Sequence, residues 1–200
     1  MTKIKFCGLS RPCDIEAANE LKPEYVGFVF AEKSKRYVTP EKAKELKLML
    51  DPEIKAVGVF VNENLERVVR LLNNDVIHIA QLHGSEDEDY IRRLRNLTDK
   101  PIIKAFRIEA ARDIASAESC TADYVLLDSG AGTGTVFDWK LIQDIRRPYF
   151  LAGGLGVHNV ENAVKLLRPF AVDVSSGIET NGVKDKIKMA EFAAAATNSA

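Results

Sequence analysis

Short apolar segments alternate along the chain with longer segments whose apolar residues recur every three to four positions. The short segments are typical of strands, and the longer ones have the spacing of amphipathic helices. The predicted strands cover residues 4–8, 25–30, 54–62, 76–84, 101–108, 123–129, 149–155 and 170–179. The predicted helices cover residues 12–22, 40–50, 64–74, 87–97, 111–120, 138–145, 159–167 and 183–196. The pattern therefore predicts eight strand–helix units with no element left over.

Regular alternation of strands and helices predicts a parallel sheet with helices outside it. Several predicted strands are almost continuously apolar, which is typical of strands buried on both faces. An open, doubly wound sheet usually has fewer units, so we predict an α/β fold of the (β/α)8, or TIM, barrel type. The 200 residues leave little room for insertions, and we expect a single domain over residues 1–200.

Composition and charge narrow the class of protein further. The chain is 46% hydrophobic and 28% charged with a net charge of -1, which is ordinary for a globular protein. We expect no nucleic-acid partner, because no basic cluster is present, and no membrane span, because no apolar run approaches about 20 residues. The N-terminus lacks a secretory pattern, so we expect a cytoplasmic protein. The three cysteines and three histidines have no metal-binding or disulfide spacing, so we expect neither.

The ends of the last two predicted strands are rich in glycine and serine. In barrels of this type the functional groups follow the carboxyl ends of the strands, and the last two loops commonly hold phosphate. Glycine lets backbone N–H groups approach an anion closely, and serine hydroxyls add donors. We therefore predict phosphate binding at Gly153, Gly154, Ser175, Ser176 and Gly177.

A thiol and a carboxyl group end two other predicted strands. Cys7 ends the first strand, and Asp128 follows four apolar residues in the sixth, where burial would raise its pKa. These strands come from different parts of the ring, so the two groups can face each other across a ligand as base and acid. The alternative is that Cys7 is simply a small buried apolar residue. The pattern favours a proton-transfer reaction without cofactor, such as an isomerisation, on a small phosphorylated compound.

Further polar groups occupy the same end of the predicted barrel. Gln81 and His83 end the fourth strand and are candidate substrate-binding residues. Arg36, in the loop after the second strand, either binds a ligand carboxylate or is solvated. Asp173 either points into the barrel mouth or is paired structurally. The glycine-rich loop after the sixth strand lacks the Gly-Lys-Ser/Thr ending of a P-loop.

Several motifs occur in the order and spacing found in one enzyme family. They are KFCGL, VGFVFAEKSKRYV, VGVFVN, QLHG, LLDS…GTG…FDW, LAGGL…NV and FAVDVSSGIE…GVKD. Over its whole length the chain resembles the phosphoribosylanthranilate isomerases of tryptophan biosynthesis, which are (β/α)8 barrels. The resemblance implies an Amadori rearrangement of N-(5'-phosphoribosyl)anthranilate to 1-(o-carboxyphenylamino)-1-deoxyribulose 5-phosphate, with no cofactor or metal.

The resemblance also implies roles for individual residues. Asp128 would be the general acid that protonates the ribose ring oxygen, and Cys7 the general base that removes the C2' proton. Arg36 would hold the anthranilate carboxylate, Asp173 would lie near the ribose hydroxyls, and the last two loops would hold the phosphate. Since Cys7 must act as a thiolate, we expect a nearby cation or dipole to lower its pKa, whereas burial should raise the pKa of Asp128.

The chain departs from the family pattern in the loop after the sixth strand. Ala131 replaces a glycine, and Thr135 and Val136 replace a lysine and a hydroxyl residue. These changes bear on the loop and on substrate affinity rather than on the reaction. A related barrel isomerase of histidine biosynthesis is the closest alternative, but it has an aspartate where this chain has Cys7. A non-catalytic barrel that binds a sugar phosphate would have no reason to keep a thiol and an acid at the mouth. Monomer and homodimer both stay open.

Overall fold

The computed structural model describes residues 1–128, 139–142 and 145–197, and within them eight parallel strands form a closed barrel. The strands are β1 (Lys3–Cys7), β2 (Tyr25–Val29), β3 (Lys55–Phe60), β4 (Ile79–Leu82), β5 (Ile102–Arg107), β6 (Tyr124–Asp128), β7 (Tyr149–Ala152) and β8 (Ala171–Val174). Each strand pairs with the next along the chain, and β8 pairs with β1. The predicted (β/α)8 barrel is confirmed.

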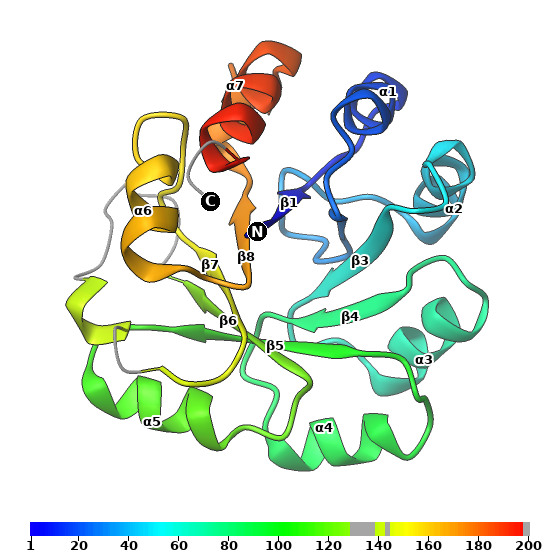
Figure 1. Cartoon of the computed structure of the whole chain (residues 1–200). Coiled ribbons are helices and arrows are strands. Elements are labelled where there is room, and N and C mark those ends of the chain that lie inside the picture. Colours follow the sequence, from blue (N-terminus) through cyan, green and yellow to red (C-terminus); the bar gives the residue numbers. More distant parts are fainter. Residues whose placement is uncertain (129–138, 143–144, 198–200) are drawn as a thin grey trace.

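Seven α-helices of the described residues surround the strands (Figure 1). They are α1 (Pro12–Leu21), α2 (Pro40–Met49), α3 (Leu65–Asn73), α4 (Glu88–Arg95), α5 (Ala111–Ser119), α6 (Val160–Leu167) and α7 (Lys186–Thr197). In the sixth unit, the described part of the predicted helix 138–145 contains a 3₁₀ helix, Trp139–Ile142. The remaining predicted positions 138 and 143–144, and the family departures at Ala131, Thr135 and Val136, lie outside the described residues.

Helix starts follow local chemistry. The Thr39 hydroxyl accepts a hydrogen bond from the Lys42 N–H, and Pro40 occupies the first turn of α2. The Asn64 side chain likewise accepts from the Glu66 N–H at the start of α3. These contacts satisfy backbone donors that have no partner within the helix, so the strand-to-helix loops end where capping residues occur.

The last unit differs from its prediction. The predicted strand 170–179 ends at Val174, continues into a 3₁₀ helix (Ser176–Ile178), and is followed by a hairpin of β9 (Glu179–Thr180) and β10 (Val183–Lys184). A straight strand is not formed because this segment turns against the loop after β7, where a Cβ atom on Gly177 would lie 2.0 Å from the Leu155 carbonyl oxygen. At the hairpin tip, Asn181 and Gly182 both have positive φ, as a two-residue turn of the Asn-Gly type requires.

Successive side chains on each strand point alternately outward, to the core between strands and helices, and inward, to the interior of the barrel. On β1, Phe6 packs outward against Phe192 of α7, with ring centroids 6.5 Å apart, whereas Lys5 pairs with Asp173 inside the barrel. At the amino end of the barrel, the Phe150 ring packs against Tyr124 and Phe170 at centroid distances of 5.8 and 5.6 Å. This aromatic cluster fills the amino end, so the carboxyl end of the barrel is the place for a ligand.

Among the described helices, none combines the length and the apolar character that a membrane crossing requires.

Candidate active site

A pocket of about 440 Å³ lies at the carboxyl ends of the strands. Every residue that the sequence predicted for the site lines it, except Gly177. These residues are Cys7, Arg36, Gln81, His83, Asp128, Gly153, Gly154, Asp173, Ser175 and Ser176. They come from strands and loops all around the ring, because parallel strands bring their carboxyl ends to one face of the barrel.

Cys7 is the last residue of β1 and is buried, with 8% of its surface exposed. Gly27 lies opposite it on β2, and a Cβ atom there would come within 2.8 Å of the Cys7 Sγ. Burial raises the pKa of the Cys7 thiol above its ordinary value, while Lys5 and Lys184 act in the opposite direction. The expectation of a lowered pKa is therefore wrong in its net direction: the cation is present, but desolvation of the thiolate outweighs it.

Lys5 was not predicted as part of the site. Its ammonium group is fully buried and donates a hydrogen bond of 2.9 Å to Asp173 Oδ1. Burial alone would lower the pKa of Lys5, but Asp173 and Cys7 raise it above its ordinary value. The sequence left two alternatives for Asp173, and both are realised: it lines the pocket and also forms a structural ion pair. The available signal for Lys5 was its spacing two residues before Cys7, on the same face of the strand.

A chain of hydrogen bonds connects β4 to β6 across the pocket. Gln81 Nε2 lies 2.9 Å from His83 Nδ1, and His83 Nε2 lies 3.2 Å from Asp128 Oδ2. With the Gln81 amide donating to Nδ1, the imidazole carries its proton on Nε2 and donates it to Asp128 Oδ2; this tautomer is assigned from the network. The Gln81 Oε1 atom is buried and has no hydrogen-bond partner within the described part of the chain. The three predicted residues therefore form one unit.

Arg36 is held by an acidic residue that the sequence did not single out. Its Nε and Nη2 atoms donate to the two carboxylate oxygens of Glu179 at 2.6 and 2.9 Å. Lys184 donates to Glu179 at 2.7 Å and to the Ser175 carbonyl oxygen at 2.9 Å. Burial would raise the pKa of Glu179, but Arg36 and Lys184 lower it below its ordinary value. Arg36 is thus neither simply solvated nor without a partner: it lines the pocket while paired.

The two glycine-rich loops contact each other at the pocket. Gly153 and Gly154 have φ values of 84° and 62°, which side chains with a Cβ rarely adopt. The Asn159 side chain accepts from the Gly156 N–H and donates to the Gly154 carbonyl oxygen, which fixes the loop after β7. Gly177 supports the site from outside the pocket, where it packs against Leu155 and Gly156. The predicted phosphate residues are therefore brought together, with Gly177 in a packing role.

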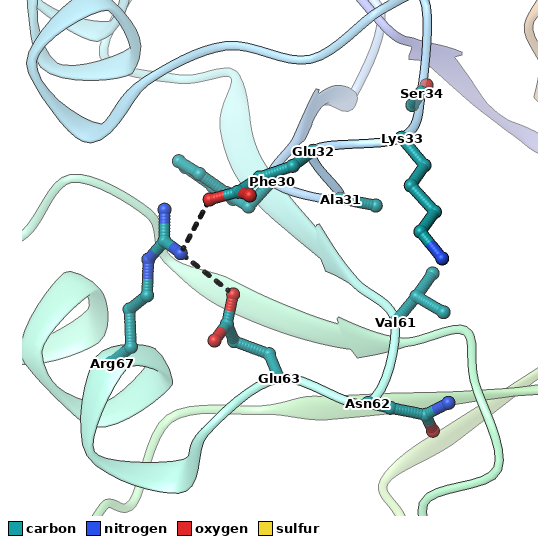
Figure 2. A pocket seen from close by; sticks show the side chains of 9 residues that line it. All are labelled: Phe30, Ala31, Glu32, Lys33, Ser34, Val61, Asn62, Glu63 and Arg67. Atoms are coloured by element: carbon teal, nitrogen blue, oxygen red, sulfur yellow. Dashed lines mark ion pairs between the residues drawn. The ribbon is translucent and has the colours of Figure 1, made fainter.

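A second pocket, of about 690 Å³, adjoins the first at the loops after β2 and β3 (Figure 2). It shares Ala31, Ser34 and Val61 with the first pocket. Arg67 forms ion pairs with Glu32 at 3.7 Å and Glu63 at 3.2 Å, and Figure 2 shows it between them. Although it is larger, this pocket contains none of the predicted catalytic side chains, so it extends the rim of the site.

No cluster of three or more His, Cys, Asp or Glu side chains in the described residues has the arrangement of a metal site. The chemistry that the pocket offers is that of its thiol, its carboxyl group linked to imidazole, its cations and the two loops with Gly153, Gly154, Ser175 and Ser176.

Comparison with known proteins agrees with this geometry. Residues 4–195 match the family model described as N-(5'-phosphoribosyl)anthranilate (PRA) isomerase. The N-(5'-phosphoribosyl)anthranilate isomerase of Endomicrobium trichonymphae is 45% identical over 196 residues, which cover 96% of each chain. A crystal structure of phosphoribosyl anthranilate isomerase from Thermotoga maritima superposes with a TM-score of 0.90 at 36% identity, covering 99% of this chain and 100% of that one.

A crystal structure of a phosphoribosyl anthranilate isomerase in complex with reduced 1-(o-carboxyphenylamino)-1-deoxyribulose 5-phosphate is similar as well. Its TM-score is 0.89 and its identity 37%, with 99% of this chain and 100% of that chain covered. The barrel, the family match and the full-length relatives agree, and the chain belongs to the N-(5'-phosphoribosyl)anthranilate isomerase family.

Proposed function

We propose that the pocket at the carboxyl end of the barrel carries out the family's isomerisation, with Cys7 as general base and Asp128 as general acid. The observation that carries this proposal is that both groups line one pocket, from β1 and from β6, together with two glycine-rich loops. The reaction is the Amadori rearrangement of N-(5'-phosphoribosyl)anthranilate, a step of tryptophan biosynthesis.

The first half of the reaction opens the ribose ring. Asp128 in its protonated form gives its proton to the ring oxygen, the bond between C1' and that oxygen breaks, and the nitrogen lone pair forms the C=N bond of a Schiff base. The hydrogen bond from His83 to Asp128, with Gln81 behind the imidazole, holds the carboxyl group in one orientation. A positioned acid of this kind contributes about 10²–10⁴-fold to a rate.

The second half moves a proton from C2'. The Cys7 thiolate takes this proton, and the C–H electrons form the C1'–C2' double bond of an enolamine, while the electrons of the C=N bond return to nitrogen. The enolamine then tautomerises to the ketone by gaining a proton at C1' and losing one from the 2'-hydroxyl. The Asp173 carboxylate, which lines the pocket next to β1, is a suitable acceptor for a ribose hydroxyl.

Binding of the two ends of the substrate follows from the walls of the pocket. Val29, Ala31 and Val59 form a small apolar cluster with Cys7, which suits the aromatic ring. Arg36 lies beside this cluster and uses two of its five N–H groups on Glu179, so its guanidinium can also donate to the anthranilate carboxylate. The backbone N–H groups of Gly153, Gly154, Ser175 and Ser176 would receive the phosphate.

The protein would act on this small molecule in the cytoplasm, as a monomer or a homodimer, and without a nucleic-acid or membrane partner. Light scattering on the purified chain distinguishes the two assemblies.

Phosphoribosylanthranilate generated in the assay and followed by the loss of its fluorescence tests the activity. Wild type should consume it, whereas Cys7→Ala and Asp128→Ala should lose about 10²-fold or more in kcat and still bind a product analogue. Cys13→Ala is the matched control, because Cys13 is an exposed cysteine on α1, and it should keep full activity.

Two results would count against the assignment. A Cys7→Ala protein with wild-type turnover would return Cys7 to a packing role. Wild-type protein that binds the product analogue without turnover would favour a non-catalytic sugar-phosphate barrel, and turnover of the histidine-pathway substrate alone would favour the related isomerase.

A further inference from the structure

Lys5 is a buried charged group that the proposed mechanism does not use. It lies inside the barrel with no exposed surface, and its ammonium donates to Asp173 Oδ1 at 2.9 Å. Burying an ammonium group costs several kcal/mol, and a partner carboxylate offsets that cost only in part. An apolar side chain at this position would be the simpler solution for a barrel core, so the ammonium calls for a functional reason.

The strand directs Lys5 toward the thiol. Residues two apart on a strand project to the same face, so Lys5 lies directly below Cys7 on β1. The Lys5 ammonium and the Cys7 thiol interact electrostatically, in the sense that favours a charged sulfur. The register of β1 on β8 sets Asp173 opposite Lys5, so the cation has a carboxylate on the neighbouring strand and a thiol on its own strand face.

The other charged groups around Cys7 are engaged elsewhere. Lys184 on β10 and Arg36 in the loop after β2 both interact electrostatically with Cys7, but both donate to Glu179 at 2.6–2.9 Å. Across the pocket, His83 faces the Asp128 carboxylate at 3.2 Å. Lys5 is paired as well, with Asp173, but of these three cations it is the one that shares a strand face with Cys7, and its burial leaves its charge little screened by solvent.

We propose that Lys5 is a positioning residue whose ammonium stabilises the Cys7 thiolate and thereby enables this buried thiol to act as a base. Asp173 holds the ammonium in place, and it also limits the effect because its own negative charge opposes a second anion nearby. The inference rests on the proposed role of Cys7 as the base. It gives the reason why the first strand carries a lysine inside the barrel.

Alkylation of the cysteines by iodoacetamide as a function of pH, followed peptide by peptide with mass spectrometry, tests this proposal independently of turnover. Only the thiolate reacts, so the pH midpoint of alkylation reports its stability. In Lys5→Met the midpoint of Cys7 should move up by about one pH unit or more, as loss of a neighbouring opposite charge predicts. In Asp173→Asn it should move down. Cys13 in the same samples is the internal reference and should not move.

A double variant distinguishes a folding defect from a direct effect of Lys5 on the thiolate. Lys5→Met alone leaves a buried carboxylate without its cation, which destabilises the fold. Lys5→Met/Asp173→Asn removes both charges, and its Cys7 midpoint should lie at least about one pH unit above that of Asp173→Asn alone. The acidic limb of the kcat/KM profile should shift in the same direction in variants that keep measurable activity.

Equal Cys7 midpoints in Asp173→Asn and in the double variant would overturn the proposal, whatever the activity. If the midpoint shifts as expected but Cys7→Ala keeps wild-type turnover, Lys5 stabilises the thiolate and the role of Cys7 as the base is the part that fails.

Discussion

Two glycines next to Cys7 leave room for side chains of the site. Gly27 faces Cys7 on the neighbouring strand, where a Cβ atom would lie 2.8 Å from the sulfur. Gly8 follows Cys7 with φ of +80°, and a Cβ atom there would lie 2.5 Å from Arg36 Cδ. The Gly27 carbonyl oxygen also accepts hydrogen bonds from the N–H groups of Gly8 and Leu9, which turns the chain away from the pocket. The position of the thiol therefore depends on the missing side chain of Gly27, and the position of Arg36 depends on that of Gly8.

Adding one of these methyl groups should displace the thiol. In Gly27→Ala the new Cβ would meet the Cys7 Sγ closer than real contacts allow, so the sulfur must move by several tenths of an ångström. Because small misplacements of reacting groups are costly, we expect kcat/KM to fall at least about tenfold. Steady-state kinetics, with far-UV circular dichroism to verify the fold, measures this effect.

Gly58→Ala is the matched control, since Gly58 is a strand glycine whose Cβ would meet Ile77 Cδ1 at 2.5 Å in the outer core. Overpacking there should lower the free energy of unfolding by about 1–3 kcal/mol while the folded protein keeps its kcat. Unchanged kcat/KM in Gly27→Ala would show that the thiol has more room than the structure indicates.

At the scale of elements, the β9–β10 hairpin connects two parts of the site. Glu179 and Lys184 are paired across the hairpin, and their side chains are only 6% and 3% exposed. Glu179 reaches Arg36 in the loop after β2, and Lys184 reaches Ser175 in the loop after β8. The Ser175 hydroxyl in turn donates to the Cys7 carbonyl oxygen at 3.0 Å. The hairpin therefore holds the cationic loop and the serine loop in a fixed relation to β1.

Neutralising Glu179 should loosen this connection. In Glu179→Gln, Lys184 loses its buried counter-charge, and we expect the free energy of unfolding to fall by about 3 kcal/mol. Arg36 loses its bidentate partner, so KM should rise several-fold, more than kcat falls. Urea unfolding and steady-state kinetics measure the two effects.

Glu161→Gln is the control, because Glu161 pairs with Lys165 on the exposed face of α6 and should change stability by less than about 0.5 kcal/mol. Equal stabilities of the two variants would mean that the Glu179 network contributes no more than a surface ion pair.

The barrel could be predicted because each of its units is encoded locally, by a change of apolar period and by capping residues such as Thr39 and Asn64. The end of the last strand could not, because the constraint on Gly177 comes from Leu155 in another unit. Arg36 and Glu179 are 143 positions apart, and nothing local pairs them. Lys5 could be predicted only in part. The sequence shows that it shares a strand face with Cys7, but its carboxylate partner, Asp173, lies on β8.

In the molecule as a whole, packing and chemistry are separated along the barrel axis. Tyr25, Tyr124, Phe150 and Phe170 pack together at the amino end, with ring centroids 5.1–5.8 Å apart. The Lys3 ammonium lies 4.3 Å from the centroid of the Phe170 ring, which adds a cation–π contact at this end. The carboxyl end contains the open pocket and the ion pairs of Glu179 with Arg36 and Lys184. Changes of pH should therefore act mainly through titratable groups outside the aromatic cluster, and little through the cluster itself.

Several carboxylates within the described residues have pKa values below their ordinary ones in the folded protein, because hydrogen bonds and neighbouring cations favour their charged form. They are Asp75, Glu88, Asp113, Glu179 and Asp185. Where the folded-state pKa is lowered, the unfolded chain binds more protons in acid, so the stabilisation is complete above the unfolded pKa and is lost as pH falls. We expect the free energy of unfolding, measured with urea, to decline below about pH 4.5, with Glu179 contributing most because the other four carboxylates are exposed or partly exposed to solvent. A protein as stable at pH 3 as at pH 6 would contradict this.

His78 should add a smaller decline in the free energy of unfolding, which begins at a higher pH than that of the carboxylates. Its Nδ1 accepts a hydrogen bond from the Ala56 N–H at 2.9 Å, and burial lowers its pKa below the ordinary value of 6.5 in spite of Asp75 nearby. The unfolded chain therefore takes up a proton here before the folded protein does, and stability begins to fall as pH drops through about 6.5. His78→Gln removes the titrating group, so the variant should be less stable than wild type at pH 8 but should lose less between pH 7 and pH 5. If the free energy of unfolding, measured with urea, fell equally in the two proteins between pH 7 and pH 5, His78 would not be the group responsible.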